Sequence, residues 1–70
     1  MTGEEYRALL KRRGLRQADG AWLCDQCLRA STKWVLNGPS PPAALLLQAY
    51  DEGALGIDWF AQHVTRPIPK

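Results

Sequence analysis

We predict an all-α fold, a compact bundle of four to five short helices, for this chain of 70 residues. Apolar side chains recur at the spacing of helix faces, and no segment shows the alternation that is typical of a strand. Residues that begin or end helices, such as Thr2, Gly14 and Ser40, separate these segments at short intervals. The sequence is 46% hydrophobic and contains three tryptophans, which favours a folded domain over a disordered tail.

The first helix is predicted to begin after Thr2 and to end at Gly14. Thr2 and Glu5 have the spacing of a capping box, in which each side chain bonds the other residue's backbone amide. Gly14 readily adopts the left-handed backbone that ends many helices. The side chains predicted on the buried face of this helix are Tyr6, Leu9 and Leu10.

Two further helices are predicted over about residues 17–24 and 28–36. Gly20 lies inside the first of them and lowers its stability by roughly 1 kcal/mol relative to Ala. Asn37 and Gly38 tolerate left-handed backbone and are expected to end the second. The side chains expected on or near the inner side of this second helix are Leu28, Ser31, Trp34 and Val35.

The remaining helices are predicted around residues 43–51 and 59–64. Ser40 is expected to cap the fourth helix, with Pro41 or Pro42 in its first turn, where a missing amide hydrogen costs nothing. Asp58 is expected to cap the last helix, whose apolar side chains Trp59, Phe60 and Val64 fold back on the core. We expect one domain over residues 1–65 and a loose C-terminal tail over residues 66–70.

The segment from Gln17 to Asn37 has the layout of a helix-turn-helix, a unit that places one helix in the major groove of DNA. Two helix-sized pieces meet at a tight break, and Ala21 provides a small side chain where two crossing helices can touch. The second piece offers three polar side chains at helical spacing, which are Arg29, Thr32 and Lys33.

Over residues 2–52 the sequence resembles the phage-repressor class of helix-turn-helix proteins, the lambda-repressor-like or XRE-type family. Gln17 and Ala21 match the family pattern at the start and the fifth position of the motif. Trp34, the Asn37-Gly38 turn, the prolines at 39, 41 and 42 and the leucines at 45–47 match the family's layout after the motif. Three positions depart from the pattern: Gly20 and Ser31 replace large apolar residues, and Asp25 replaces the usual turn glycine.

The resemblance implies a sequence-specific DNA-binding protein, encoded by a phage or prophage, that acts as a repressor or small transcriptional regulator. It also implies that the helix around residues 28–36 enters the major groove of double-stranded DNA. The residues expected at this DNA-binding site are Arg16, Gln17, Gln26, Leu28, Arg29, Thr32 and Lys33. Further contacts to phosphates are expected from Lys11, Arg12 and Arg13. Because one small module presents little surface, we expect a homodimer on a palindromic site.

The charge distribution also favours a polyanionic partner. The net charge is only +2, but the segment from Arg7 to Lys33 contains seven basic residues and only two acidic ones. Solvated helix faces commonly carry such charges, so ordinary surface residues remain the alternative for this pattern. No apolar run approaches the roughly 18 residues of a membrane span, and we expect a cytoplasmic protein. No catalytic motif surrounds His63 and no phosphate-binding glycine loop exists, so we expect no enzyme, no cofactor and no small-molecule substrate.

Two alternatives stay open. In the first, the same helical fold grips another protein, as a small phage inhibitor or adaptor, and its tryptophans provide the interface energy. In the second, zinc stabilises the fold through Cys24 and Cys27, with His63 as a third ligand. The sequence offers no second cysteine pair to complete four ligands, so we expect no metal and interpret Cys24 as a core residue.

Overall fold

The computed structural model describes residues 1–69, and within that range the chain forms five helices and no strand. The predicted all-α fold is therefore confirmed. No helix among these residues is long and apolar enough to cross a membrane. In chain order the helices are α1 (Gly3–Arg13), α2 (Gln17–Leu23), α3 (Leu28–Asn37), α4 (Pro41–Asp51) and α5 (Ile57–His63).

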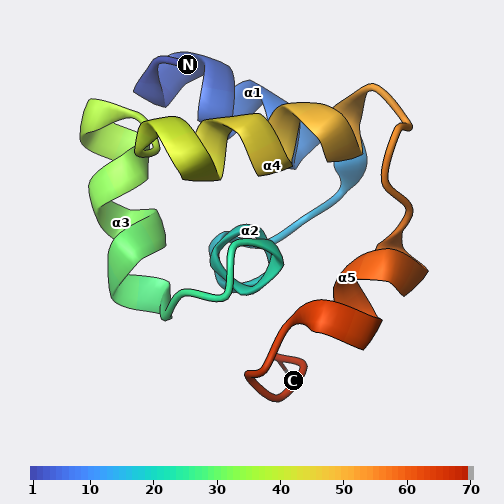
Figure 1. The fold of residues 1–70 in the computed structure, drawn as a ribbon. Helices are drawn as coiled ribbons and strands as arrows, with labels where there is room; N and C mark the ends of the chain where they lie inside the picture. Colours follow the sequence, from blue (N-terminus) through green and yellow to red (C-terminus); the bar gives the residue numbers. More distant parts are fainter. Residues whose placement is uncertain (70) are drawn as a thin grey trace.

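The helices pack around α2, which is seen end-on in the middle of Figure 1. α1 and α4 run along one side of the molecule, and α3 descends from them to the short turn that leads back to α2 (Figure 1). α5 and the C-terminal segment lie on the other side of α2, so the two chain ends are at opposite ends of the molecule (Figure 1). This arrangement leaves the long side of α3 at the edge of the fold.

The core is one cluster to which every helix contributes. Its largest fully buried side chains include Tyr6 and Leu9 from α1, Leu23 from α2, Leu47 from α4 and Phe60 from α5. α3 contributes Trp34, whose ring meets the Tyr6 ring edge-on at 5.6 Å between centroids. Such edge-to-face aromatic pairs add stability beyond the area they bury.

Most of the predicted helix ends are confirmed. Thr2 and Glu5 form the complete capping box, with the Thr2 amide donating to Glu5 Oε1 at 2.9 Å and the Glu5 amide donating to Thr2 Oγ1 at 3.1 Å. Gly14 caps α1 in the left-handed conformation, with a φ of 68°. Ser40 is the N-cap residue of α4 and prolines begin that helix, although the Ser40 side chain forms no capping hydrogen bond.

Three local predictions differ from the structure. α5 begins one residue before Asp58 and Gly56 is its N-cap, so Asp58 lies in the first turn, where its charge suits the helix dipole. Leu28 was predicted near the inner side of α3 but is 54% exposed. Of the aromatic pair in α5, Phe60 is in the core while Trp59 is 38% exposed. In the C-terminal tail predicted over residues 66–70, the carbonyls of Arg66 and Pro69 accept hydrogen bonds from Trp22 and Arg16.

Candidate nucleic-acid interface

α3 has one face in the core and one face in solvent. Ser31 is fully buried and Trp34 nearly so, and these two side chains attach the helix to α1 and α2. The opposite side carries exposed residues at successive turns: Leu28, Arg29, Thr32, Lys33 and Leu36. The three polar residues predicted to read DNA therefore share the exposed side of a helix whose inner side is fixed.

The Tyr6 side chain contacts both Gly20 and Ser31. The Tyr6 hydroxyl forms a 2.5 Å hydrogen bond with Ser31 Oγ in the interior, so a valine at that position would remove its partner. A side chain added at Gly20 would run into the same hydroxyl and into the end of Leu10. The Tyr6 hydroxyl thus occupies the space beside Gly20 and is the hydrogen-bond partner of Ser31.

The turn between α2 and α3 is closed by Asp25 in place of the usual glycine. Asp25 has a φ of 56°, a left-handed conformation that aspartate adopts more readily than most residues. The Asp25 amide donates to the Trp22 carbonyl and the Gln26 amide to the Ala21 carbonyl, both at 2.9 Å. These two bonds form a Schellman ending for α2, which lets α3 start after a turn of only a few residues.

Arg29 and Lys33 are exposed, and neither forms an ion pair with any residue in the range 1–69. Thr32 is exposed, and its Oγ1 donates to the Leu28 carbonyl at 3.2 Å. Gln26 and Leu28 are also exposed, at the beginning of α3. The predicted base-reading residues are thus gathered on one helix and its first turn.

The basic residues at the end of α1 are arranged differently. Arg12 binds the Asp51 carboxylate through two nitrogens, at 3.3 and 2.6 Å, and Arg13 Nε binds the same carboxylate at 3.0 Å. These bonds tie α1 to α4, and the Arg12 guanidinium holds the pKa of Asp51 below its usual range. Lys11 is exposed and forms no ion pair within the described range. Of the three predicted phosphate contacts, two are therefore already paired with an acid.

Arg16 and Gln17 mark the start of α2, as predicted. Arg16 is the N-cap residue, and its side chain pairs with Asp19 Oδ1 at 3.0 Å. The hydrogen bonds to Asp19 raise the pKa of Arg16 and lower that of Asp19. Gln17 is exposed. The Asp19 carboxylate would compete with a DNA phosphate for Arg16.

The two cysteines lie in different environments and are both reduced. Cys24 is buried, and burial raises its pKa to about 12. Cys27 is exposed at the N-cap of α3, where the backbone amides of Ala30 and Arg29 lower its pKa. His63, the third residue considered as a zinc ligand, stacks on Trp59 with 4.4 Å between the ring centroids. Residues 1–69 contain no group of three side chains placed to hold a metal ion.

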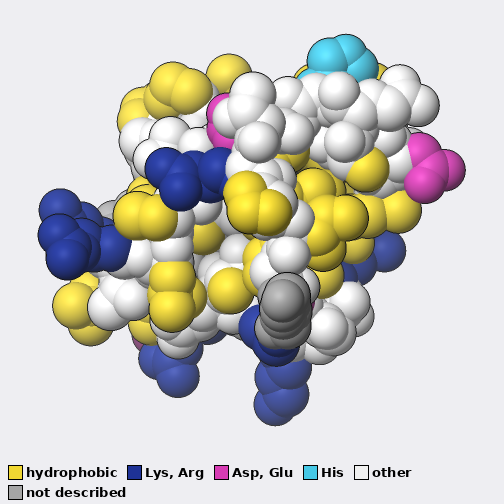
Figure 2. Space-filling view, turned by 90° about the horizontal axis from the view of Figure 1, so that it is seen from below, with side chains coloured by type: hydrophobic (Ala, Val, Ile, Leu, Met, Phe, Trp, Pro, Cys, Tyr) yellow, Lys and Arg dark blue, Asp and Glu magenta, His cyan; other side chains and the backbone are white. Residues whose placement is uncertain are grey.

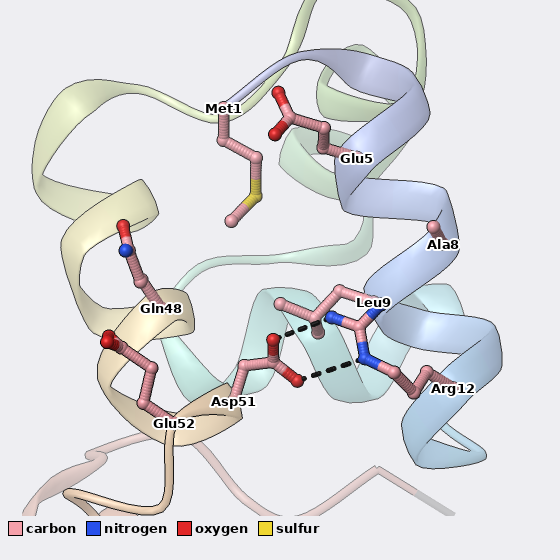
Figure 3. A pocket seen from close by; sticks show the side chains of 8 residues that line it. All are labelled: Met1, Glu5, Ala8, Leu9, Arg12, Gln48, Asp51 and Glu52. Carbon is pink, nitrogen blue, oxygen red and sulfur yellow. Dashed lines mark hydrogen bonds and ion pairs between the residues drawn. The ribbon is translucent and has the colours of Figure 1, made fainter.

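A hollow of about 450 Å³ lies between α1 and α4 on the side of the N-terminus (Figure 3). The Arg12–Asp51 pair crosses its floor, and Glu5 and Glu52 stand at its rim (Figure 3). The side chains that line it are Met1, Glu5, Ala8, Leu9, Arg12, Gln48, Asp51 and Glu52, a set without a nucleophile or a histidine.

The face with the C-terminal segment is shown in Figure 2. Hydrophobic side chains lie across its middle, and Lys and Arg side chains project around its edges (Figure 2). The sequence predicted one polyanion-facing surface from the basic half of the chain. On this face the cations are spread apart rather than gathered in one patch.

Comparison with known proteins gives no relative: no protein-family model, no curated protein and no solved structure matches the chain. The interface is therefore described by this chain's own residues. Sequence reasoning overlooked two residues beside it, Thr65 and Arg66, which hydrogen-bond to Asp25 across 40 residues of chain or more. No local pattern in the sequence signals such a contact.

Proposed function

We propose that the protein is a sequence-specific DNA-binding transcriptional regulator, encoded by a phage or prophage, that places α3 in the major groove of double-stranded DNA. The observation that carries the proposal is the division of α3 into two faces. Ser31 and Trp34 fix the inner face in the core, while Arg29, Thr32 and Lys33 are exposed on the outer face. A rigid helix with outward cations is the arrangement that reads base edges.

The chemistry of each outer side chain suits a base or a phosphate. Arg29 has the planar donor pair that bridges O6 and N7 of guanine, and the Thr32 methyl can contact thymine. Lys33 contributes a point charge for a phosphate or a guanine. α3 has ten residues, about 15 Å of helix, and a helix with its side chains is about 10–12 Å in diameter, which fits a groove about 12 Å wide.

The size of the molecule favours a dimer. Its largest dimension is 28 Å, whereas half-sites for such helices lie about 34 Å apart along the duplex. Two copies side by side would place one α3 in each of two successive major grooves. We therefore expect a palindromic operator bound by a homodimer, with the regulated gene downstream of it.

The experiment compares binding to DNA from upstream of the protein's own gene with binding to random DNA. Arg29→Ala combined with Lys33→Ala should leave the thermal stability unchanged and remove the discrimination between the two DNAs. The matched control, Arg7→Ala, also removes an exposed cation but lies on α1. It should leave the discrimination ratio unchanged. Equal discrimination by the native protein and the α3 variant would contradict the proposal.

One observation favours a second function, a module that binds another protein. The outer face of α3 also carries Leu28 and Leu36, which are 54% and 77% exposed. A partner helix could cover these leucines, because exposed aliphatic side chains gain most from burial. A tight protein complex that is insensitive to Arg29→Ala would favour this function. Unfolding by a chelator would instead favour the zinc-stabilised alternative through Cys24 and Cys27.

A further inference from the structure

The C-terminal strap, which we define as residues 64–69, is fastened to α2 and to the turn before α3. The Trp22 indole Nε1 donates to the Arg66 carbonyl at 3.0 Å. At the far end of the strap, Arg16 donates to the Pro69 carbonyl at 3.2 Å. These two hydrogen bonds connect the strap to Arg16, at the start of α2, and to Trp22, near its end.

Asp25 is the main anchor of the strap. Its carboxylate accepts hydrogen bonds from the Thr65 amide at 3.2 Å and from Thr65 Oγ1 at 2.9 Å. Its backbone carbonyl accepts a hydrogen bond from Arg66 Nε at 3.3 Å. Arg66 is consequently fixed at two points: its carbonyl accepts a hydrogen bond from the Trp22 indole, and its guanidinium donates one to the turn before α3.

Arg66 lies beside the N-terminal end of α3. It lines a surface hollow of about 270 Å³ together with Gln26, Cys27 and Leu28. Its charge is close enough to Cys27 to help lower the pKa of that thiol. Arg66 is exposed and forms no ion pair with residues 1–69, in contrast to Arg12, Arg13 and Arg16. Of its guanidinium nitrogens, only Nε forms a hydrogen bond within that range.

We infer that Arg66 is a further DNA contact of the proposed interface and that it binds a backbone phosphate next to the groove that α3 enters. Asp25, Thr65 and Trp22 are positioning residues, because they fix the strap and not the DNA. The inference rests on the proposed function. The strap lies over α2 and not on the outer face of α3, so Arg66 would reach the sugar-phosphate ridge rather than the base edges.

The test measures affinity against salt concentration for operator and random DNA. A phosphate contact contributes a slope of about 0.9 in log affinity against log salt, or about eightfold in affinity at 0.1 M salt. Arg66→Ala should lose about this much on both DNAs, with the discrimination ratio unchanged. Arg66→Lys should keep the slope, because the charge remains. The control Arg7→Ala, which removes an exposed arginine of α1, should also keep it.

A second pair of variants tests the anchoring by Asp25. Thr65→Val removes the hydroxyl that donates to Asp25, whereas Thr65→Ser keeps it. Thr65→Val should lower the salt slope toward that of Arg66→Ala, and Thr65→Ser should restore it. If the strap only stabilised the fold, Arg66→Ala and Thr65→Val would change the melting temperature but not the slope of log affinity against log salt.

The outcomes separate this inference from the function on which it rests. Native binding that depends on Arg29 and Lys33, together with an unchanged slope in Arg66→Ala, would overturn only the role of Arg66. Tighter binding after removal of residues 66–70 would overturn it as well, because the strap would then cover the interface. An absence of salt-dependent binding by the native chain would overturn both proposals.

Discussion

The inner and outer sides of residues 24–37 differ in how their polar groups are satisfied. On the inner side, Ser31 is fully buried and its hydroxyl is paired with Tyr6. On the outer side, Arg29 and Lys33 are exposed and have no acidic partner in residues 1–69. Buried polar groups need a partner, while exposed cations are satisfied by water and keep their charge for a ligand. The same short segment therefore both holds the fold and presents the candidate interface.

This comparison shows why a count of basic residues overstates the cations that are free to bind DNA. Arg12 and Arg13 at the end of α1 are bound to Asp51 from α4. Arg29 and Lys33 are also helical and exposed, but no carboxylate lies near enough in the described chain to pair with them. Arg29 and Lys33 could therefore bind a phosphate or an acidic surface of a partner without first breaking an ion pair.

The largest difference between the two sides is expected in thiol reactivity. Burial raises the pKa of Cys24 from 9.0 to about 12, so its reactive thiolate is about a thousandfold scarcer than for an ordinary cysteine. The pKa of Cys27 is lowered by backbone amides at the start of α3. We expect iodoacetamide to label Cys27 at least about a hundredfold faster than Cys24 in the native protein at pH 7.5, measured by mass spectrometry.

Two controls accompany the labelling. Cys27→Ser should leave only the slow reaction, and urea should make the two native cysteines react at similar rates because burial is lost. Equal rates in the folded protein would show that Cys24 is accessible, and the inner side of this segment would then not be closed.

The next effect concerns the buried hydrogen bond between Tyr6 and Ser31. Ser31→Val leaves the Tyr6 hydroxyl without its partner, and Tyr6→Phe does the same to Ser31. Each change should lower the free energy of unfolding by about 1–3 kcal/mol, the usual cost of an unpaired buried polar group. The double variant removes both polar groups, so its loss should be clearly smaller than the sum. Urea denaturation of the four proteins measures this coupling.

Additive losses in that cycle would mean that the two hydroxyls do not depend on each other. The outer side provides the reference, because Thr32→Val removes a hydroxyl that is exposed and bonded only within its own helix. We expect Thr32→Val to change the free energy of unfolding by less than about 0.5 kcal/mol.

The sequence predicted the helices well because their signals are local. The capping box of Thr2 and Glu5, the left-handed Gly14 and the prolines that begin α4 lie within one turn of the ends they define. The apolar spacing likewise placed Tyr6 and Leu9 in the core. The exposed positions of the candidate interface follow from the same helical periodicity.

The remaining features depend on residues far apart in the chain. Gly20 lies against the Tyr6 hydroxyl, and Ser31 forms a hydrogen bond with it, although Tyr6 belongs to a different helix from either residue. The strap is held by a carboxylate at Asp25 that is 40 positions from Thr65. The pairing of Arg12 with Asp51 spans a similar distance, so the sequence alone assigned that arginine to DNA. Helical periodicity contains no information on such pairs.

The smallest expected effect concerns Asp51, which neutralises the α1 arginines and so distinguishes them from those of α3. Arg12 lowers the folded-state pKa of Asp51, so the carboxylate stabilises the fold above the unfolded-state pKa of about 3.9. This stabilisation is lost as pH falls through the lower folded-state pKa. Asp51→Asn should therefore melt at a slightly lower temperature than the native protein at pH 7, and the two melting temperatures should converge in acid.

The matched control is Glu52→Gln, which removes the neighbouring exposed carboxylate that forms no ion pair within residues 1–69. Its melting temperature should follow that of the native protein across the same pH range. If Asp51→Asn also followed the native curve, Arg12 and Arg13 would not be held by Asp51 in solution. They would then be as available to a phosphate as Arg29 and Lys33, and the distinction between the two basic regions would disappear.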